Sequence, residues 1–138
     1  MPDTWIQEAI NYWKICNIGL TDGADLNSIT SLEKQINIKL PEDFIEFYQV
    51  VNGFKDLDMN NNMFSIWPIE KIKEEYTAGG NNKFIGFSDY LIFSHTVGFL
   101  KNSYGVFNDF DFEKPVLNTF KEFINFINSP LDDTSIPK

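Results

Sequence analysis

The chain has 138 residues, of which 20 are Asp or Glu and 11 are basic, so the formal net charge is −9. This length is typical of one domain whose core needs no disulfide or metal. The hydrophobic content of 43% and aromatic content of 16% exclude a disordered acidic tail. Every basic residue is lysine. The acidity argues against nucleic-acid binding, because phosphates require a basic surface.

The chain lacks the signals of secretion or membrane insertion. Its start has no basic stretch followed by an apolar one, and no apolar run approaches the ~20 residues of a membrane span. The single cysteine, Cys16, has no partner for an internal disulfide. We therefore expect an acidic, soluble, cytoplasmic protein that contacts neither membrane nor nucleic acid.

Apolar spacing and capping patterns predict two helices in the first part of the chain. Asp3 or Thr4 can cap the first helix, and residues 20–25 then read as a turn. Thr30 and Glu33 form a capping-box pattern, which predicts that a short second helix opens at Thr30 and ends at Asn37. The apolar stripe of the first helix consists of Trp5, Ile6, Ala9, Ile10, Trp13 and Cys16.

The third predicted helix has the clearest boundaries. Pro41 suits the first helical position, and Glu42 and Asp43 complement the helix dipole in the first turn. Asn52 and Gly53 predict the stop, because glycine tolerates the left-handed conformation that ends many helices.

The middle of the chain changes from helical to alternating spacing. Residues 54–62 read as a polar loop, residues 63–67 as a strand that ends at Pro68, and residues 69–76 as a short charged helix. A flexible turn is expected over residues 77–82. Four further strands are then predicted to form an antiparallel meander, at residues 84–87, 90–94, 97–101 and 104–107.

A second capping box, Thr119 with Glu122, opens the last helix, which Ser129 and Pro130 end. Helices, then strands, then a closing helix indicate an α+β fold: an antiparallel or mixed sheet of about four to six strands, flanked by N-terminal helices and a C-terminal helix. We expect one domain over residues 1–130 and a frayed acidic tail over residues 131–138.

The motifs around the third helix resemble a known family. Leu-Pro opening a helix and Asn-Gly after it, then an aromatic strand and a Pro-Ile-Glu-Lys-Ile segment, are similar to the signature of the SUKH superfamily (the Smi/Knr family). The resemblance covers roughly residues 25–127. It is carried by Leu32, Glu33, Ile38, Lys39, Leu40, Pro41, Glu42, Asp43, Phe44, Phe47, Tyr48, Asn52 and Gly53, by residues 63–72, and by Phe120, Phe123 and Ile124.

This resemblance implies an α+β fold and a function in protein binding. Many bacterial members are implied to be immunity proteins that bind and neutralise a toxin, often a nuclease, whereas eukaryotic members resemble scaffolds. The signature residues Leu40, Pro41, Asn52, Gly53 and Trp67 are implied to be structural. No catalytic set and no cofactor carry over from the family.

Few residues support an enzyme. Cys16 lies on an apolar stripe near a helix C-terminus, which disfavours a thiolate. His95, the only histidine, could act with Ser94 or Ser88, although adjacent strand residues point to opposite faces. One histidine and one cysteine cannot build the usual zinc sites.

Two acidic stretches are candidate contact groups. Asp56 and Asp58 resemble the start of a calcium loop but lack its later glycine and glutamate. Residues 108–113 alternate acids with phenylalanines, so an extended strand would place Asp109, Asp111 and Glu113 on one face and both phenylalanines on the other. The face would be either a merely solvated one or a docking strip for a basic partner.

Three hypotheses follow for the function. The first is a non-enzymatic protein that neutralises a basic toxin through an acidic surface with aromatic anchors. Its candidate contact residues are Asp56, Asp58, Asp109, Asp111 and Glu113. The second is a scaffold or adaptor on the same fold, and the third, least favoured, is a hydrolase that uses acidic residues or His95.

Overall fold

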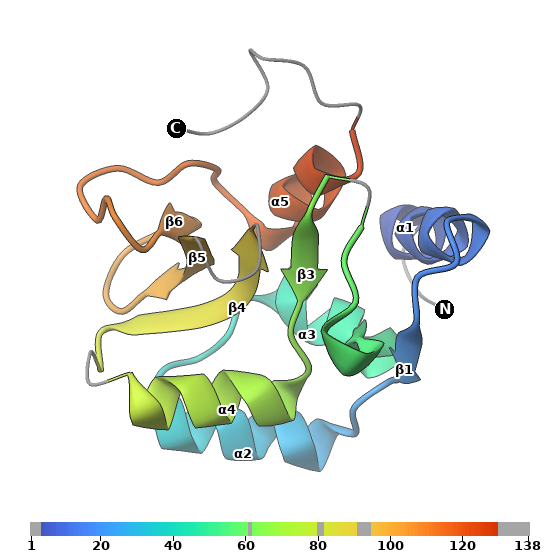
Figure 1. The fold of residues 1–138 in the computed structure, drawn as a ribbon. Helices are drawn as coiled ribbons and strands as arrows, with labels where there is room; N and C mark the ends of the chain where they lie inside the picture. Colours follow the sequence, from blue (N-terminus) through green and yellow to red (C-terminus); the bar gives the residue numbers. More distant parts are fainter. Residues whose placement is uncertain (1–3, 61, 80–81, 91–94, 130–138) are drawn as a thin grey trace.

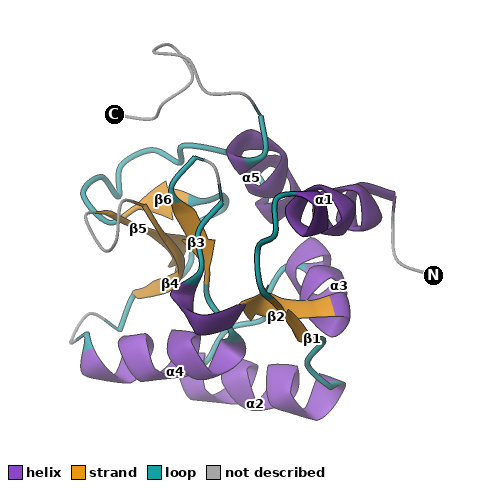
Figure 2. Cartoon of the chain, turned by 45° about the vertical axis from the view of Figure 1, so that its right-hand side comes forward, coloured by secondary structure: helices purple, strands orange, loops and turns teal. Residues whose placement is uncertain are grey.

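The computed structural model describes residues 4–60, 62–79, 82–90 and 95–129. Figures 1 and 2 show α2 and α4 side by side at one end of the molecule and α1 and α5 at the other. The elements in chain order are α1 (Thr4–Ile15), β1 (Leu20–Asp22), α2 (Leu26–Ile36), α3 (Glu42–Val50), β2 (Val51–Phe54), the 3₁₀ turn η1 (Lys55–Leu57), β3 (Phe64–Ile66), α4 (Ile69–Ala78), β4 (Phe84–Tyr90), β5 (His95–Leu100), β6 (Phe107–Asn108) and α5 (Phe120–Ile127).

The strands form two antiparallel sheets. β1 pairs with β2, and the larger sheet has the order β3-β4-β5-β6, so each of its strands lies beside its neighbour in the chain. The α+β class and the antiparallel meander are therefore confirmed. A bulge between Gly86 and Ser88 shifts the register of β4 against β5.

The core is a cluster of aromatic rings between the sheet and the helices. Phe120 of α5 lies 5.1 Å from Phe44 of α3 and 5.2 Å from Phe87 of β4, measured between ring centroids. Edge-to-face rings at such distances are favourable beyond the area that they bury. Phe87 and Phe123 meet in the same way at 5.3 Å, so the inner face of the sheet rests on α3 and α5.

Helix α1 confirms its predicted stripe, because its five buried residues are those that the spacing indicated. Cys16 lies just past the helix and is half-buried. Trp13 packs edge-to-face on Phe54 at 4.8 Å, and its indole N–H donates to Asn128 Oδ1 at 2.6 Å. The helix therefore closes one end of the core.

The predicted start of the second helix is wrong. Helix α2 begins at Leu26, because the Asp25 carboxylate accepts the backbone N–H of Ser28 and caps it, and this bond lowers the pKa of Asp25. Thr30 lies inside the helix. The Glu33 carboxylate accepts the backbone N–H of Leu40, at 2.8 Å, instead of closing a capping box.

The predicted role of Asn52 and Gly53 as a helix stop is also wrong. Helix α3 ends at Val50 and the chain passes directly into β2, with Val51 extended. Gly53 has φ +77°, and a Cβ there would lie 2.6 Å from the backbone of Trp67. Asn52 Oδ1 accepts the N–H of Ile69 at 2.8 Å, so this pair joins β2 to the start of α4.

Three other boundaries differ from the prediction. Residues 20–22 form β1 rather than a turn, because Leu20 pairs with Phe54. Of the predicted strand 104–107 only Phe107 is in a strand. The predicted break between strands 84–87 and 90–94 is wrong, because β4 runs without interruption from Phe84 to Tyr90, and residues 91–94 lie outside the described residues. The tail 131–138 lies outside them too.

The strand before Pro68, the helix α4 and the last helix are confirmed. Ile69 and Ile72 of α4 are buried, as predicted. Thr119 Oγ1 accepts the N–H of Glu122 at 3.0 Å, while the Glu122 carboxylate reaches back to the N–H of Asn118. This places the amphipathic face of α5 on the sheet.

Candidate functional site

The two acidic stretches lie at opposite edges of the four-stranded sheet. Asp56 and Asp58 precede β3, which is one edge, whereas residues 109–113 follow β6, which is the other. Three strand spacings of about 4.8 Å separate the edges by about 14 Å. Figure 1 shows the two segments on different sides of β4, so the five candidate carboxylates do not form one patch.

Asp58 holds its own loop in place. Its Oδ2 accepts the N–H of Gly19 at 2.7 Å and its Oδ1 accepts the N–H of Met59 at 3.0 Å. Asp56 is exposed, with a left-handed backbone at φ 55°. Next to them, the buried Asn60 donates to the carbonyl of Ile127. No group of three metal-ligating side chains comes together anywhere in the described residues.

The segment 109–113, which we call the acidic–aromatic segment, is not the extended strand that was predicted. The N–H of Asp111 donates to the carbonyl of Asn108 at 3.3 Å, and the N–H of Glu113 to Asp111 Oδ1 at 2.9 Å. These two bonds turn the chain. Asp109, Asp111 and Glu113 are all exposed, and Phe110 and Phe112 remain 50% and 38% exposed rather than buried together.

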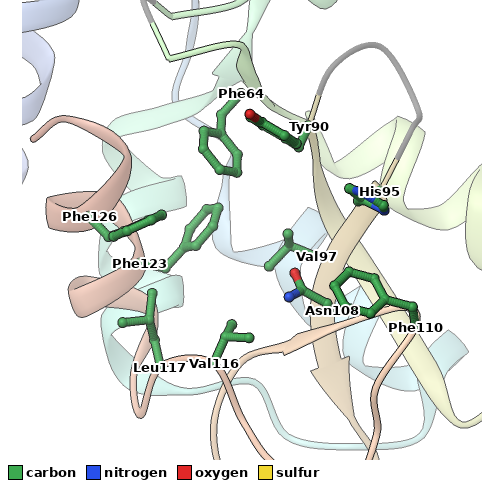
Figure 3. A pocket seen from close by; sticks show the side chains of 10 residues that line it. All are labelled: Phe64, Tyr90, His95, Val97, Asn108, Phe110, Val116, Leu117, Phe123 and Phe126. Atoms are coloured by element: carbon green, nitrogen blue, oxygen red, sulfur yellow. The ribbon is translucent and has the colours of Figure 1, made fainter. Parts of the chain in front are cut away.

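Phe110 lies on the inner side of the sheet, where it borders a small hollow that we call the inner pocket. Figure 3 shows His95 and Phe110 on one side of this pocket and Phe123 and Phe126 of α5 on the other. The pocket encloses only about 20 Å³, which is room for one water. It is lined by Phe64, Tyr90, His95, Val97, Asn108, Phe110, Val116, Leu117, Phe123 and Phe126.

Phe112 and Asp109 lie on the other side, at an open groove of about 270 Å³ that we call the outer groove. Ile85 and Phe99 pair on the face that packs on α3, so Gly86 and Gly98, paired beside them, face away from it. Phe112 stacks on Phe84 at 5.2 Å. The groove is lined by Trp67, Glu75, Tyr76, Gly79, Phe84, Gly86, Thr96, Asp109 and Phe112.

Buried hydrogen bonds hold the Trp67 wall of the outer groove. The Trp67 indole N–H donates to the buried Asp89 carboxylate at 2.6 Å, and the Tyr48 hydroxyl donates to the Trp67 carbonyl at 2.6 Å. Burial raises the pKa of Tyr48 well above its usual value, and the nearby Glu70 carboxylate adds to this. Tyr48 therefore stays a neutral donor at ordinary pH.

The catalytic candidates are not arranged for chemistry. Ser88 is fully buried, and its hydroxyl donates to the Ser65 carbonyl at 2.6 Å. His95 is exposed, with its ring parallel to Tyr90 at 6.3 Å and 4.9 Å from Phe110. Ser94 lies outside the described residues. Among the described residues, the ring contacts of His95 are therefore those with Tyr90 and Phe110.

Comparison with protein families identifies one match. The model of the SMI1 / KNR4 family (SUKH-1) matches residues 23–125, about three quarters of the chain. The chain belongs to this family. Comparison with curated proteins found no match. Within the described residues, no helix is both long and apolar enough to cross a membrane.

The residues that carry the resemblance to the family make structural contacts in this chain. Leu40 is buried, with its N–H bound by Glu33, and Pro41 precedes the first turn of α3. Asn52 and Gly53 join β2 to α4, where Trp67 is buried. Of these five residues, Trp67 lines the outer groove, and the rest of the described lining comes from other positions.

Sequence reasoning missed the groove residues that come from α4 and β5. Glu75 and Tyr76 were predicted only as the end of a charged helix, and Thr96 lies between two predicted strands. One signal was present: Gly86 and Gly98 fall inside predicted strands, where glycine often marks a close approach of another group.

Proposed function

We propose that this SUKH-1 protein is a non-enzymatic, immunity-type protein that binds and neutralises a cognate toxin with a basic surface, such as a nuclease. The observation that carries the proposal is the acidic–aromatic segment, which presents three exposed carboxylates beside two half-exposed phenylalanines. Aromatic anchors rimmed by charge are the usual composition of a protein-binding hot spot. Membership of the SUKH-1 family supports the same function.

The net charge of −9 suits such a partner. A nuclease cleft must attract phosphates, so it is basic, and complementary fields can raise association rates to about 10⁸–10⁹ M⁻¹s⁻¹ at low salt. Inhibition by occupying that cleft requires no catalytic group, no cofactor and no metal in the inhibitor. Binding must then weaken as salt screens the charges.

The test is a pull-down from the source organism, repeated across salt concentrations and followed by mixing with the purified partner. We expect a basic protein that is toxic, is retained at low salt and loses its toxicity on mixing. Capture of a non-toxic endogenous protein would instead support a scaffold or adaptor. Turnover of a substrate, lost in a His95→Ala variant, would support a hydrolase.

Two matched variants test the binding face. One neutralises Asp109, Asp111 and Glu113 together, and the other neutralises Glu8, Asp22 and Glu74, which are also exposed. Both change the net charge by the same amount. We expect the first to weaken toxin binding much more than the second, whereas equal losses would mean that only the overall charge matters. A third variant, without Asp56, tests the other edge of the sheet.

A further inference from the structure

One glycine, Gly86, lies in the lining of the outer groove. Gly86 and Gly98 lie opposite each other in β4 and β5, where most residues would project side chains from the sheet. A Cβ on Gly86 would lie 2.6 Å from Thr96 Cγ2 and 3.1 Å from the Trp67 ring. Gly86 therefore lets the Thr96 methyl and the Trp67 ring pack closely against the β4 backbone, where they form part of the groove lining.

The size of the outer groove selects its occupant. Its volume of about 270 Å³ lies just below the ~300–1,000 Å³ of most small-molecule sites. The groove is also open to solvent rather than enclosed. It therefore suits one long side chain projecting from the surface of a second protein.

The walls of the groove are aromatic and acidic. Tyr76 from α4 and Phe112 from the acidic–aromatic segment contribute rings, and Glu75 and Asp109 contribute carboxylates from the same two elements. Among the described residues that line it, none is a lysine. Rings attract a cation over their faces, and carboxylates pair with it.

Two rings of the groove already attract cations from within the chain. Lys71 Nζ lies 4.8 Å from the centroid of the Trp67 ring and 3.6 Å from the Glu75 carboxylate. Lys101 Nζ lies 5.2 Å from the centroid of the Tyr76 ring and donates to its hydroxyl at 2.8 Å. These contacts show that the rings and the Glu75 carboxylate attract cations, and a cation from a partner must share them with Lys71 and Lys101 or displace these lysines.

We propose that the outer groove is the socket for one arginine side chain of a basic protein partner. A guanidinium is planar, so it can stack on Phe112 or Tyr76 while its N–H groups bind Glu75 and Asp109. A lysine ammonium matches the charge but neither the stacking nor the forked geometry. The inference deepens the proposed function, on which it rests for the existence of a basic partner.

The test is a titration of the full-length protein, followed by ¹H–¹⁵N NMR, with three capped tripeptides Gly-X-Gly. X is arginine, lysine or citrulline, the uncharged isostere of arginine. We expect the arginine peptide to shift the Trp67 indole N–H and the amides of Gly79 and Thr96. The lysine peptide should bind about threefold more weakly, and the citrulline peptide should cause no saturable shift.

Variants separate the groove from its surroundings. Asp109→Asn and Glu75→Gln should each weaken the arginine peptide about threefold, as expected for exposed charge pairs. Phe110→Ala is the matched control for Phe112→Ala, because the two phenylalanines lie in one segment but on opposite sides of the sheet. Only Phe112→Ala should reduce binding of the arginine peptide.

Three outcomes overturn the socket: no saturable shift, equal binding of citrulline, or shifts that map away from the groove. The wild-type comparison of arginine with citrulline needs no variant, so a misfolded variant cannot obscure it. If a toxin binds and is neutralised, and if Glu75→Gln and Asp109→Asn leave its affinity unchanged, the socket is wrong and the proposed function stands. If the peptide binds the groove but no toxic partner exists, the proposed function is wrong and the socket stands.

Discussion

Replacing Tyr48 with phenylalanine tests the hydrogen bond behind the outer groove. The hydroxyl of Tyr48 is completely buried and donates to the Trp67 carbonyl at 2.6 Å. Its removal leaves that carbonyl without this donor, which costs about 2 kcal/mol. We expect urea unfolding at pH 7 to show the variant less stable than the wild type by that amount.

The difference should shrink at high pH. The pKa of Tyr48 is raised on folding, so its contribution to stability is fully present below pH 10 and is lost as the pH rises toward the folded pKa. At pH 11, ionisation of this tyrosine stabilises the unfolded wild type by about 1.4 kcal/mol. The variant has no ionisable group at this position, so its unfolded state is not stabilised in this way. The difference between the two proteins should therefore fall to about 0.6 kcal/mol.

Urea titrations at pH 7, 9, 10 and 11 measure this directly. The other four tyrosines are present in both proteins, so their ionisation cancels in the comparison. A constant difference from pH 9 to pH 11 would refute the reasoning, because it would mean that Tyr48 ionises equally well in the folded state.

Three further substitutions test other contacts by thermal and urea unfolding. Thr119→Ala removes the cap of α5 and should lower the free energy of unfolding by about 1 kcal/mol, or Tm by about 4 °C. Thr30 lies inside α2, so Thr30→Ala should leave the stability unchanged, and equal effects of the two variants would contradict the assigned helix starts. Gly98→Ala would place a Cβ 2.0 Å from the carbonyl oxygen of Ile85, a backbone atom, so a loss of at least about 3 kcal/mol is expected, and a small loss would show that β4 can move. Asp58→Ala should lower the free energy of unfolding by about 1 kcal/mol without changing partner binding. A specific loss of binding would show that this carboxylate contacts the partner.

The elements that the sequence predicted well have their determinants nearby in the chain. Helix α5 is defined by Thr119, Glu122 and an apolar stripe, all within a few residues, and β3 by alternation that ends at Pro68. Helix α2 was misplaced because two capping residues competed. The Asp25 carboxylate accepts the N–H of Ser28, three residues later. Thr30 and Glu33 match the capping-box pattern in sequence, but the Glu33 carboxylate binds the N–H of Leu40 instead.

The elements that the sequence could not predict depend on distant partners. β1 is a strand only because Leu20 meets Phe54, and residues 109–113 turn because backbone bonds beside Asn108 outweigh an alternating pattern. The outer groove combines α4, β4, β5 and the segment after β6, so no local pattern could have assembled it. Asp109 was predicted as a contact residue, while Glu75 carried no such signal.

The first helix has a consequence for how this family is delimited. The SUKH-1 match begins at residue 23, yet Trp5 stacks on Phe47 at 6.1 Å and Trp13 lies against both Phe47 and Phe54. The start of the family match therefore divides a single aromatic cluster. Without the first helix, Phe47 and Phe54 would lose their contacts with Trp5 and Trp13. The aromatic cluster that stabilises this protein is thus larger than the span that the family match covers.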